Sequence, residues 1–578
     1  MHAPRKRGEF AIVLVGLFGL MSACSNGTEP PKKLCDASNP LTLSVGEVQP
    51  AISGGCVYVS SNSSTAEYAL VPYNGDLTFA NLASVSITTS GVNTVTTQLQ
   101  SRTPGALATL NLLANQSSAS LQPSTAFETG LRQSERRVLT RLIPAAHAWQ
   151  RSHLTANGRL QPSFSIATSP PAVGDTIMLN TNSGDLAAAC TTAVFRPGRI
   201  AAISNTAIVV DDVNNPAGGY TDAEYQQIAT QFDTVFTMDT TAFGAPTDID
   251  GNGHVILFFT RAVNELTPTG SPGGIVGGFF YARDLFPKQD VSGIEGCPSS
   301  NFAEMFYLLV PDPNGVVNGN DRTKFDVSHL TVVTTAHEFQ HLINAARRLY
   351  VNTAATDFEE TWLNEGLSHT AEELLFYKQS DHLAPRMDVD SLQFKTDTIN
   401  INAYNFDQAQ NLGRFRLYLA KPSTNSPYAT NDSLATRGAT WSFLRYAADH
   451  RGASGDADTW KLLVNSTTTG LTNLQTVFGS GLPSIFRDWA IATVTDDIPG
   501  VATEWQQPSW NFRSMFNLLS TKKYPLSTVT VGDNAPLTVS LNGGGAAYVR
   551  FGVPSGQVGS LKWTTASTAV VMSLVRLK

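Results

Sequence analysis

Charged side chains are scarce in this sequence, since Asp, Glu, Lys and Arg make up only 15% of its 578 residues. The 39 basic residues are outnumbered by 47 acidic ones, which leaves a formal charge of −8. A chain without a basic surplus lacks the electrostatic footprint that phosphate recognition requires, so we expect no nucleic-acid partner. Hydrophobic residues reach 42%, which excludes a wholly disordered chain. The length predicts roughly three or four domains.

Long hydrophobic runs are also lacking, with one exception near the start of the chain. Residues 11–21 are apolar and follow a basic segment at residues 5–7, but they are fewer than the ~20 residues that a membrane-spanning helix needs. This pattern predicts a signal peptide over residues 1–23. The small residues before Cys24 resemble the lipobox of bacterial lipoproteins, which implies a lipid on Cys24, a lipidated tether over residues 24–36 and a membrane-anchored place in the bacterial cell envelope. Secretion without the lipid is the alternative.

Cysteine is rare, with five in the chain. Without Cys24 an even number remains, which indicates disulfides in an oxidising compartment. Four cysteines allow three pairings, and proximity in the sequence favours the pairing that joins neighbours. None of the cysteines has the CxxC spacing of a redox or zinc site, so we expect a structural role. The favoured pairs are Cys35 with Cys56 and Cys190 with Cys297.

The pattern of apolar residues changes along the chain and predicts an α+β protein. Short alternating runs separated by Gly, Asn and Ser predict a small β-sandwich-like domain over residues 37–122, and residues 123–169 read as a helical linker or pro-region. Residues 170–515 alternate strands with helices, including two strong helical segments between about 327 and 378. Residues 523–578 return to short strands and predict a second, C-terminal β-sandwich-like domain.

One motif dominates the chemistry that the sequence can support: His337-Glu338-Phe339-Gln340-His341. It lies in a helical segment, where residues i and i+4 share a face. Two imidazoles one turn apart can therefore bind one Zn²⁺ ion, and the glutamate beside the first can reach a water on the metal.

A zinc site of this kind needs a third protein ligand, and Glu365 is the candidate. It falls in the second helical segment, within Trp362-Leu363-Asn364-Glu365-Gly366. The stretch between His341 and Glu365 is long enough for a turn and an antiparallel return, which would bring the two helices together. The residues after His341 contain no third histidine at the spacing of metzincins.

These segments resemble the gluzincin metallopeptidases, the group that contains thermolysin and aminopeptidase N, and within it the chain is most similar to the hyicolysin family of secreted bacterial peptidases. The resemblance also includes residues 248–253 and 437–446, and it covers roughly residues 170–515. It implies a thermolysin-like zincin catalytic domain, with a mixed sheet and a helical lobe, that acts on protein or peptide substrates and is flanked by the small β-sandwich domains. The implied ligands of one Zn²⁺ ion are His337, His341 and Glu365, and the implied general base is Glu338.

Other parts of the family pattern are absent. Aminopeptidases of this clan carry a tyrosine two residues before a Lys-Gly pair, and Ala435 stands at that position. Thermolysin-like enzymes carry an aspartate that orients a zinc-bound histidine, where this chain has His369. The aminopeptidase sequence Gly-Ala-Met-Glu-Asn is not found, which favours an endopeptidase. The candidates for the oxyanion-stabilising and orienting roles are His369, Glu372, Tyr428 and Tyr446.

Residues 248–253 form a loop with oxygen ligands at alternate positions, as an EF-hand loop does. These ligands are Asp248, Asp250 and Asn252. The twelfth position is Phe259 rather than the bidentate glutamate of an EF-hand. A tight, glycine-rich turn is therefore the main expectation, and Ca²⁺ held with ligands from elsewhere in the chain is the alternative.

Two other functions compete with that of a zinc endopeptidase. A surface binding or adhesion lipoprotein would use the same fold as a catalytically silent scaffold. A structural zinc domain would close the fourth metal position with a protein ligand. The intact set of two histidines and two glutamates favours the peptidase, and metal content measured together with activity separates all three.

Overall fold

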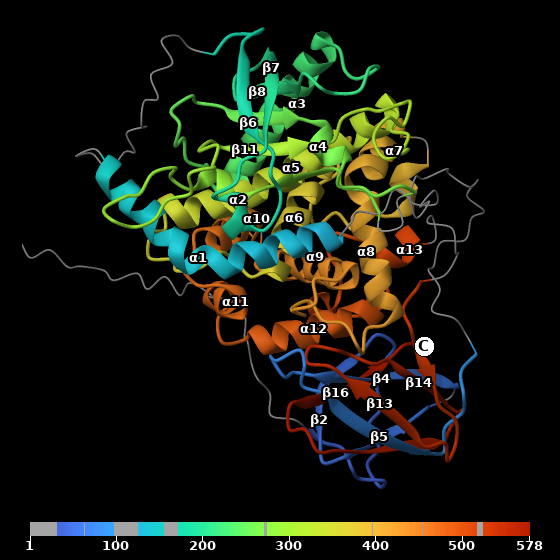
Figure 1. Ribbon diagram of the computed structural model, residues 1–578. Coiled ribbons are helices and arrows are strands. Elements are labelled where there is room, and N and C mark those ends of the chain that lie inside the picture. Colours follow the sequence, from blue (N-terminus) through green and yellow to red (C-terminus); the bar gives the residue numbers. More distant parts are fainter. Residues whose placement is uncertain are drawn as a thin grey trace, which may run out of the picture.

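The computed structural model describes residues 32–62, 64–96, 125–154, 171–270, 274–395, 397–452, 455–516 and 524–578. The predicted signal peptide and the lipidation site at Cys24 lie outside these ranges. Figure 1 shows a larger lobe, built from one sheet and many helices, above a smaller lobe of strands. Within the described ranges, no helix combines the length and the apolar character that crossing a membrane requires.

A six-stranded mixed sheet forms the centre of the larger lobe. Its strand order is β10-β11-β9-β8-β7-β6, in which β8, β9 and β11 run parallel and the remaining neighbours pair antiparallel. Every residue of β9 is buried, as the continuous apolar run in its sequence predicts. The strands are β6 (Thr176–Asn180), β7 (Phe195–Ile203), β8 (Ala207–Asp212), β9 (Val255–Phe259), β10 (Gly278–Phe280) and β11 (Met305–Leu308).

The helices that cover this sheet begin at polar caps. In α3 (Asp222–Phe243), Thr221 and Glu224 form a reciprocal capping box. The Thr323 side chain accepts a hydrogen bond from the Asp326 N–H and so begins α5 (Lys324–Tyr350). Helix α3 packs against β7 and β8, and α5 packs against β10 and β11. The helix that carries the histidine motif therefore lies at the β10 edge of the sheet.

A helical lobe follows α5 in the sequence, and its helices approach closely. Gly366, in α6, faces Thr440 so tightly that a Cβ atom there would lie 2.4 Å from the threonine side chain. Helix α6 contacts both α5 and α9. The helices are α6 (Thr361–Gln379), α7 (Thr398–Ala403), α8 (Ala409–Ala420), α9 (Leu434–Asp449), α10 (Gly455–Val464), α11 (Gly470–Phe478), α12 (Leu482–Thr495) and α13 (Phe512–Phe516). Shorter turns are α2 (Leu186–Ala189), α4 (Arg261–Asn264), η3 (Ala282–Leu285), η4 (Ser391–Phe394), the π-helical η5 (Tyr404–Gln408) and η6 (Thr503–Trp505).

The smaller lobe differs from the expectation of two separate β-sandwiches, because strands from both ends of the chain build a single one. Its two sheets have the orders β1-β2-β16-β4-β14-β12 and β13-β5-β15-β3. Strand β4 pairs with β14 on one side and β16 on the other, so neither terminal segment completes a sheet alone. Figure 1 shows the blue N-terminal and red C-terminal strands intermixed. The strands are β1 (Lys32–Lys33), β2 (Val48–Ser53), β3 (Cys56–Ser60), β4 (Ala66–Asn74), β5 (Ala83–Ser90), β12 (Val529–Thr530), β13 (Leu537–Leu541), β14 (Val549–Val553), β15 (Val558–Thr565) and β16 (Val570–Arg576).

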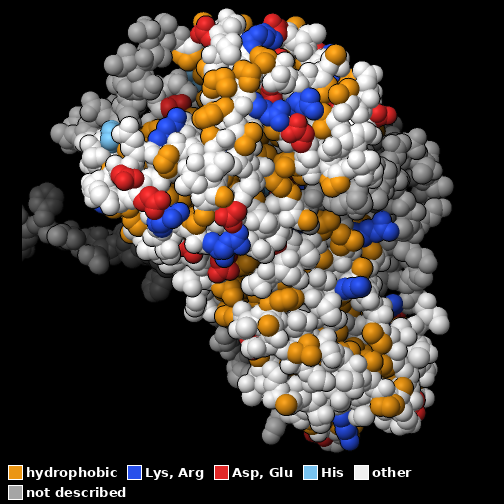
Figure 2. All heavy atoms as spheres, viewed as in Figure 1, with side chains coloured by type: hydrophobic (Ala, Val, Ile, Leu, Met, Phe, Trp, Pro, Cys, Tyr) orange, Lys and Arg blue, Asp and Glu red, His pale blue; other side chains and the backbone are white. Residues whose placement is uncertain are grey.

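Both disulfides join the cysteines that are neighbours in the sequence, and charged side chains are sparse on the face of the molecule drawn in Figure 2. Cys35 pairs with Cys56 and Cys190 with Cys297, as proximity in the sequence favours. On the face shown in Figure 2, charged side chains gather in small groups of mixed sign over the larger lobe, and few lie over the sandwich.

The predicted helical linker is a long helix, α1 (Thr125–His153), that packs into the larger lobe. Leu139, Leu142 and Trp149 are buried in the same core cluster as the central sheet. Figure 1 shows α1, in cyan, lying across the larger lobe. Its contacts with α5 bring it to the helix that carries the histidine motif.

Candidate metal centre

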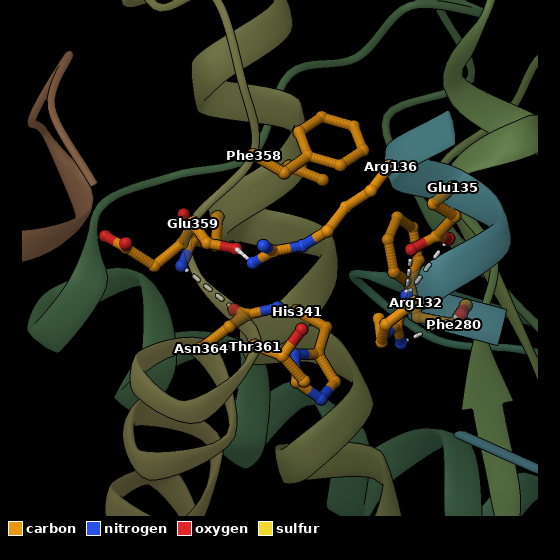
Figure 3. A pocket seen from close by; sticks show the side chains of 11 residues that line it. Arg132, Glu135, Arg136, Phe280, His341, Phe358, Glu359, Thr361 and Asn364 are labelled. Atoms are coloured by element: carbon orange, nitrogen blue, oxygen red, sulfur yellow. Dashed lines mark hydrogen bonds and ion pairs between the residues drawn. The ribbon is translucent and has the colours of Figure 1, made fainter. Parts of the chain in front are cut away.

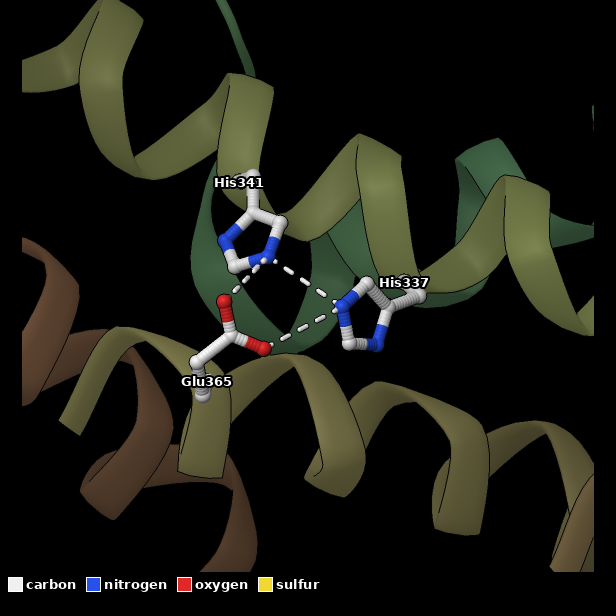
Figure 4. A group of neighbouring side chains, drawn as sticks. All are labelled: His337, His341 and Glu365. Carbon is white, nitrogen blue, oxygen red and sulfur yellow. Dashed lines mark hydrogen bonds and ion pairs between the residues drawn. The ribbon is translucent and has the colours of Figure 1, made fainter. Parts of the chain in front are cut away.

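Two helices bring the three predicted metal ligands together. His337 and His341 lie one turn apart on α5, and their Nε2 atoms are 3.2 Å apart. Glu365, on α6, places Oε2 3.5 Å from His337 Nε2 and Oε1 3.5 Å from His341 Nε2. Figure 4 shows the two rings and the carboxylate pointing toward one another from these helices.

The spacing of these atoms fits a tetrahedral metal ion. Ligands at about 2.0–2.1 Å from zinc lie about 3.4 Å from each other when the geometry is tetrahedral. The three distances between ligand atoms, 3.2, 3.5 and 3.5 Å, are close to that value. Two histidines and one carboxylate are also the ligand set of many catalytic zinc sites. The three residues can therefore hold one ion and leave a position open.

The electrostatics of the group favour a cation. Burial opposes a charge on His337, yet hydrogen bonds to Glu365 and Glu372 and the charge of Glu338 raise its pKa to about 10. Burial likewise opposes the charge of Glu365, but Arg437 and His341 hold the pKa of that carboxyl well below its usual range. The group thus keeps a carboxylate beside two imidazoles, and a metal ion would displace the proton on His337.

Glu338 lies beside the ligands and is held by the edge strand of the sheet. Its Oε2 accepts a hydrogen bond of 2.8 Å from the Phe280 N–H at the end of β10. Burial raises the pKa of Glu338 to about 7, and His337 and Arg132 oppose part of that rise. A carboxylate with a pKa near neutral is suited to accept and return a proton.

Glu372 lies where a carboxylate that orients His337 would stand, a role for which the sequence offered both Glu372 and His369. Its Oε1 lies 2.8 Å from His337 Nδ1, so a proton on Nδ1 is shared with the carboxylate and Nε2 is free for a metal. Arg414 binds the other oxygen, Oε2, at 3.2 Å. His369 Nδ1 lies 3.1 Å from Oε1, and burial lowers the pKa of His369 to about 3. His369 therefore supports Glu372 as a neutral ring.

Loss of the Glu372 carboxylate is expected to weaken zinc binding. Replacing Glu372 with alanine leaves His337 Nδ1 without its partner, and such substitutions reduce metal affinity by about 10–100-fold. Glu372→Gln keeps a hydrogen-bond acceptor without the charge and should lie between alanine and the unmodified chain. Competition with a fluorescent zinc chelator measures the three affinities. Equal affinity in all three proteins would show that Glu372 does not orient the ligand.

Arg437 is a part of the centre that sequence reasoning did not assign. Its Nη1 lies 2.8 Å from Glu365 Oε2, in an ion pair that is not aligned as a hydrogen bond, and its Nε and Nη2 donate to Asp432. Nη1 also donates to Glu128 Oε2, at 2.6 Å. The signal in the sequence was the Arg-Gly pair at the position of the Lys-Gly pair of aminopeptidases.

The two tyrosine candidates lie elsewhere. The Tyr428 hydroxyl donates to the carbonyl oxygen of Asp76, at the sandwich. The Tyr446 hydroxyl donates to the carbonyl oxygen of Glu504. Neither tyrosine lines the cavities beside the histidines.

The loop at residues 248–253 is a tight turn beside a buried carboxylate. The Asn252 amide donates a hydrogen bond to Asp250 inside the turn, at 2.7 Å. Glu304, which precedes β11, joins Asp248 and Asp250 to form a group that could hold a cation. Burial raises the pKa of Glu304 to about 8 and that of Asp250 to about 7. Nothing in the local sequence indicated Glu304, because β11 follows long after the loop.

These raised pKa values predict a pH dependence of stability. Unfolded carboxyls titrate near pH 4, so between about pH 4 and pH 8 the folded state binds more protons than the unfolded state, and stability falls as the pH rises. The Glu304→Gln variant lacks one of the titrating groups. Between about pH 5 and pH 8, the free energy of unfolding of the variant should therefore fall less steeply than that of the unmodified chain. Urea unfolding of both proteins in a calcium chelator measures the two slopes. Parallel slopes would contradict the prediction.

In the described part of the chain, two small cavities lie beside the candidate ligands. A cavity of about 20 Å³ is lined by His341 with Arg132 and Glu135 of α1 (Figure 3). A second, of about 60 Å³, is lined by His337 and Glu338. Such volumes hold only a few waters. A cavity of about 720 Å³ between α3, α6 and α10 includes none of the candidate ligands.

Comparison with known proteins gives one informative match. No protein-family profile matches the chain. A curated protein named neutral metalloprotease ShpI, from Staphylococcus hyicus, is 31% identical over 163 residues, which are 28% of this chain and 33% of that protein. The similarity thus spans about a third of the relative. Over that part, the chain is similar to a metalloprotease. Among the described residues, it also has groups of His and Glu that could hold a metal ion.

Proposed function

We propose that the chain is a zinc-dependent endopeptidase that hydrolyses protein substrates outside the cytoplasm. The observation that carries the proposal is the convergence of the two histidines and Glu365, within 3.2–3.5 Å of one another, next to the buried carboxylate of Glu338. The partial similarity to a neutral metalloprotease supports the same activity.

The residues of the centre have separate tasks in this reaction. His337, His341 and Glu365 would hold the zinc ion, with Glu372 fixing the first ring through Nδ1. When bound, zinc would supply Lewis acidity toward the scissile carbonyl and toward a nucleophilic water near neutral pH. Glu338 would take a proton from the attacking water and pass it to the departing amine. The Phe280 N–H holds Oε2 of Glu338 and thereby fixes the direction of the base.

The location is part of the proposal. Two disulfides support an oxidising compartment. A signal peptide before Cys24, with a lipid on that cysteine, would anchor the enzyme to the bacterial cell envelope. Unanchored secretion is the alternative. Palmitate labelling of the chain expressed with its first 36 residues, beside Cys24→Ala, tests the anchor.

Cleavage of a labelled protein tests the activity. Fluorescent, denatured casein is incubated with the unmodified chain and with Glu338→Gln, each before and after limited proteolysis with trypsin and inactivation of the trypsin. The zinc content of each sample is measured in parallel. We expect about one zinc per chain in both proteins and cleavage by the unmodified chain alone.

The other outcomes separate the competing functions. Zinc without cleavage by either protein would favour the surface binding lipoprotein. Zinc that resists chelation, again without cleavage, would favour a structural metal domain. Absence of zinc, or equal cleavage by Glu338→Gln, would contradict the peptidase.

A further inference from the structure

Helix α1 lies directly over the candidate metal centre, although it precedes the centre by about 200 residues in the chain. Three of its side chains line the cavity at His341, and Glu128 lines the cavity at His337. Figure 3 shows Arg132 and Glu135 reaching from α1 toward Phe280 and the side of His341. The helix thus contributes to both of the small spaces that remain at the centre.

On one side, α1 occupies the free edge of the central sheet. β10 is an edge strand, and the backbone of Phe280 bonds to side chains rather than to β11. Arg132 Nη2 donates to the Phe280 carbonyl at 3.1 Å, and Glu135 Oε1 accepts from the Ala282 N–H at 2.9 Å. The Arg132 donor and the Glu135 acceptor thus bind backbone groups of two residues that are two positions apart. An extended peptide added to this edge of the sheet would place its own backbone N–H and C=O groups there.

On the other side, α1 is bound to the helical lobe. Glu128 receives a hydrogen bond from Arg437 Nη1, the atom that also lies 2.8 Å from the ligand Glu365. Arg136 Nη2 donates to the carbonyl of Glu359, at 3.3 Å, just before α6. The helix therefore joins the two walls of the centre.

The polar contacts of α1 are not those of a helix that only supports the fold. Arg132 and Glu135 form an ion pair at 2.9 Å, and their side chains are only 8% and 3% exposed. Burying such a pair costs desolvation that its own attraction need not repay. The apolar face, with Leu139, Leu142 and Trp149, already anchors the helix in the core. The buried ion pair instead saturates backbone groups beside the centre.

The result is a centre that a protein substrate cannot reach in this conformation. His337 and Glu338 are 7% and 4% exposed. The adjoining cavities, of about 20 and 60 Å³, are far smaller than a peptide segment. We propose that α1 is a built-in inhibitor that occupies the substrate groove, the space between the free edge of β10 and the helical lobe. Arg132 and Glu135 stand there in place of substrate backbone groups, and Arg437 holds Glu128. This inference rests on the proposed peptidase function.

Displacement of α1 is compatible with the topology. The sandwich is held by pairing between β2–β5 and β13–β16, in which α1 takes no part. Release of α1 from the groove therefore breaks no strand pairing in either lobe.

Substitutions on the groove side of α1 test the role in the intact chain. The double variant Arg132→Ala/Glu135→Ala removes both contacts with the edge strand together, so that no charge is left unpaired. Glu128→Gln is a milder second variant that weakens only the contact with Arg437. Arg137→Ala is the matched control, because Arg137 lies on α1 but forms an exposed ion pair with Asp185, away from the centre. Each is measured for zinc content, for casein cleavage with and without Glu338→Gln, and for hydrogen exchange of the α1 amides.

We expect the double variant to cleave about tenfold faster or more than the unmodified chain, the change that a loss of about 1.4 kcal/mol of docking free energy produces. Glu128→Gln should be intermediate, Arg137→Ala unchanged, and the α1 amides should exchange faster in the two activated variants. Zinc bound in every protein, with Glu338-dependent cleavage no faster in either groove variant, would overturn the inhibitory role alone. Absence of zinc, or of Glu338-dependent cleavage in every form, would overturn the proposed function and the inhibitory role with it.

Discussion

Replacing Glu338 by glutamine is expected to reduce peptide hydrolysis by about 10²–10⁴-fold while leaving zinc bound. The carboxylate is the group placed beside the ligands to accept a proton, and an amide of the same shape cannot accept one. Its oxygen can still receive the Phe280 N–H, so the local structure should be retained. Initial rates on labelled casein, measured with zinc content and a thermal unfolding curve, give the comparison.

A glutamate that carries an ion pair away from the centre provides the control. Glu265 pairs with Arg196 and Arg261 at the surface, so Glu265→Gln makes the same chemical change without touching the site. It should leave the rate unchanged. A Glu338→Gln protein that retains a rate within a few-fold of the unmodified chain would remove Glu338 from the reaction.

Removal of one ligand is expected to abolish stable zinc binding. His341→Ala leaves two of the three converging atoms, and Glu365→Gln removes the carboxylate that balances the charge of the ion. Metal affinity depends on ligand number and charge, so the zinc content after dialysis against a mild chelator should fall from near one to near zero. Elemental analysis of the dialysed proteins measures it.

Another histidine on the same helix is the matched control. His329 lies two turns before His337 on α5 and stacks on Phe406. His329→Ala should therefore keep its zinc. Full zinc content in both His341→Ala and Glu365→Gln would place the metal elsewhere in the chain.

The candidate ligands could be predicted from the sequence because each lies in a short segment whose helical pattern can be recognised without the rest of the fold. The spacing of His337 and His341 on a helix fixes which face they share, and a second helix after a short turn brings Glu365 opposite them. Strands β6, β8 and β9 also lie in residues 170–515, where strands alternating with helices were expected, because continuous apolar runs bounded by polar turns have few other structures available.

The parts that were missed depend on contacts between distant segments. Strand β4 pairs with strands about 500 residues later, so two separate β-sandwiches were expected where a single one is built from both ends of the chain. The position of α1 over the centre, and the roles of Arg437 and Glu304, likewise come from residues that meet only after folding. Tyr428 was a candidate by residue type, but its hydroxyl satisfies a carbonyl of the sandwich.

The dependence of casein cleavage on bound metal decides whether the chain is a zinc peptidase. The groove-side double variant and the unmodified chain are assayed as purified, after removal of metal with a zinc chelator, and after one equivalent of zinc is returned. If the chain is a zinc peptidase, we predict Glu338-dependent cleavage that disappears when the metal is removed and returns when zinc is added. Cleavage that survives complete removal of the metal, or no cleavage by either zinc-loaded protein, would contradict it.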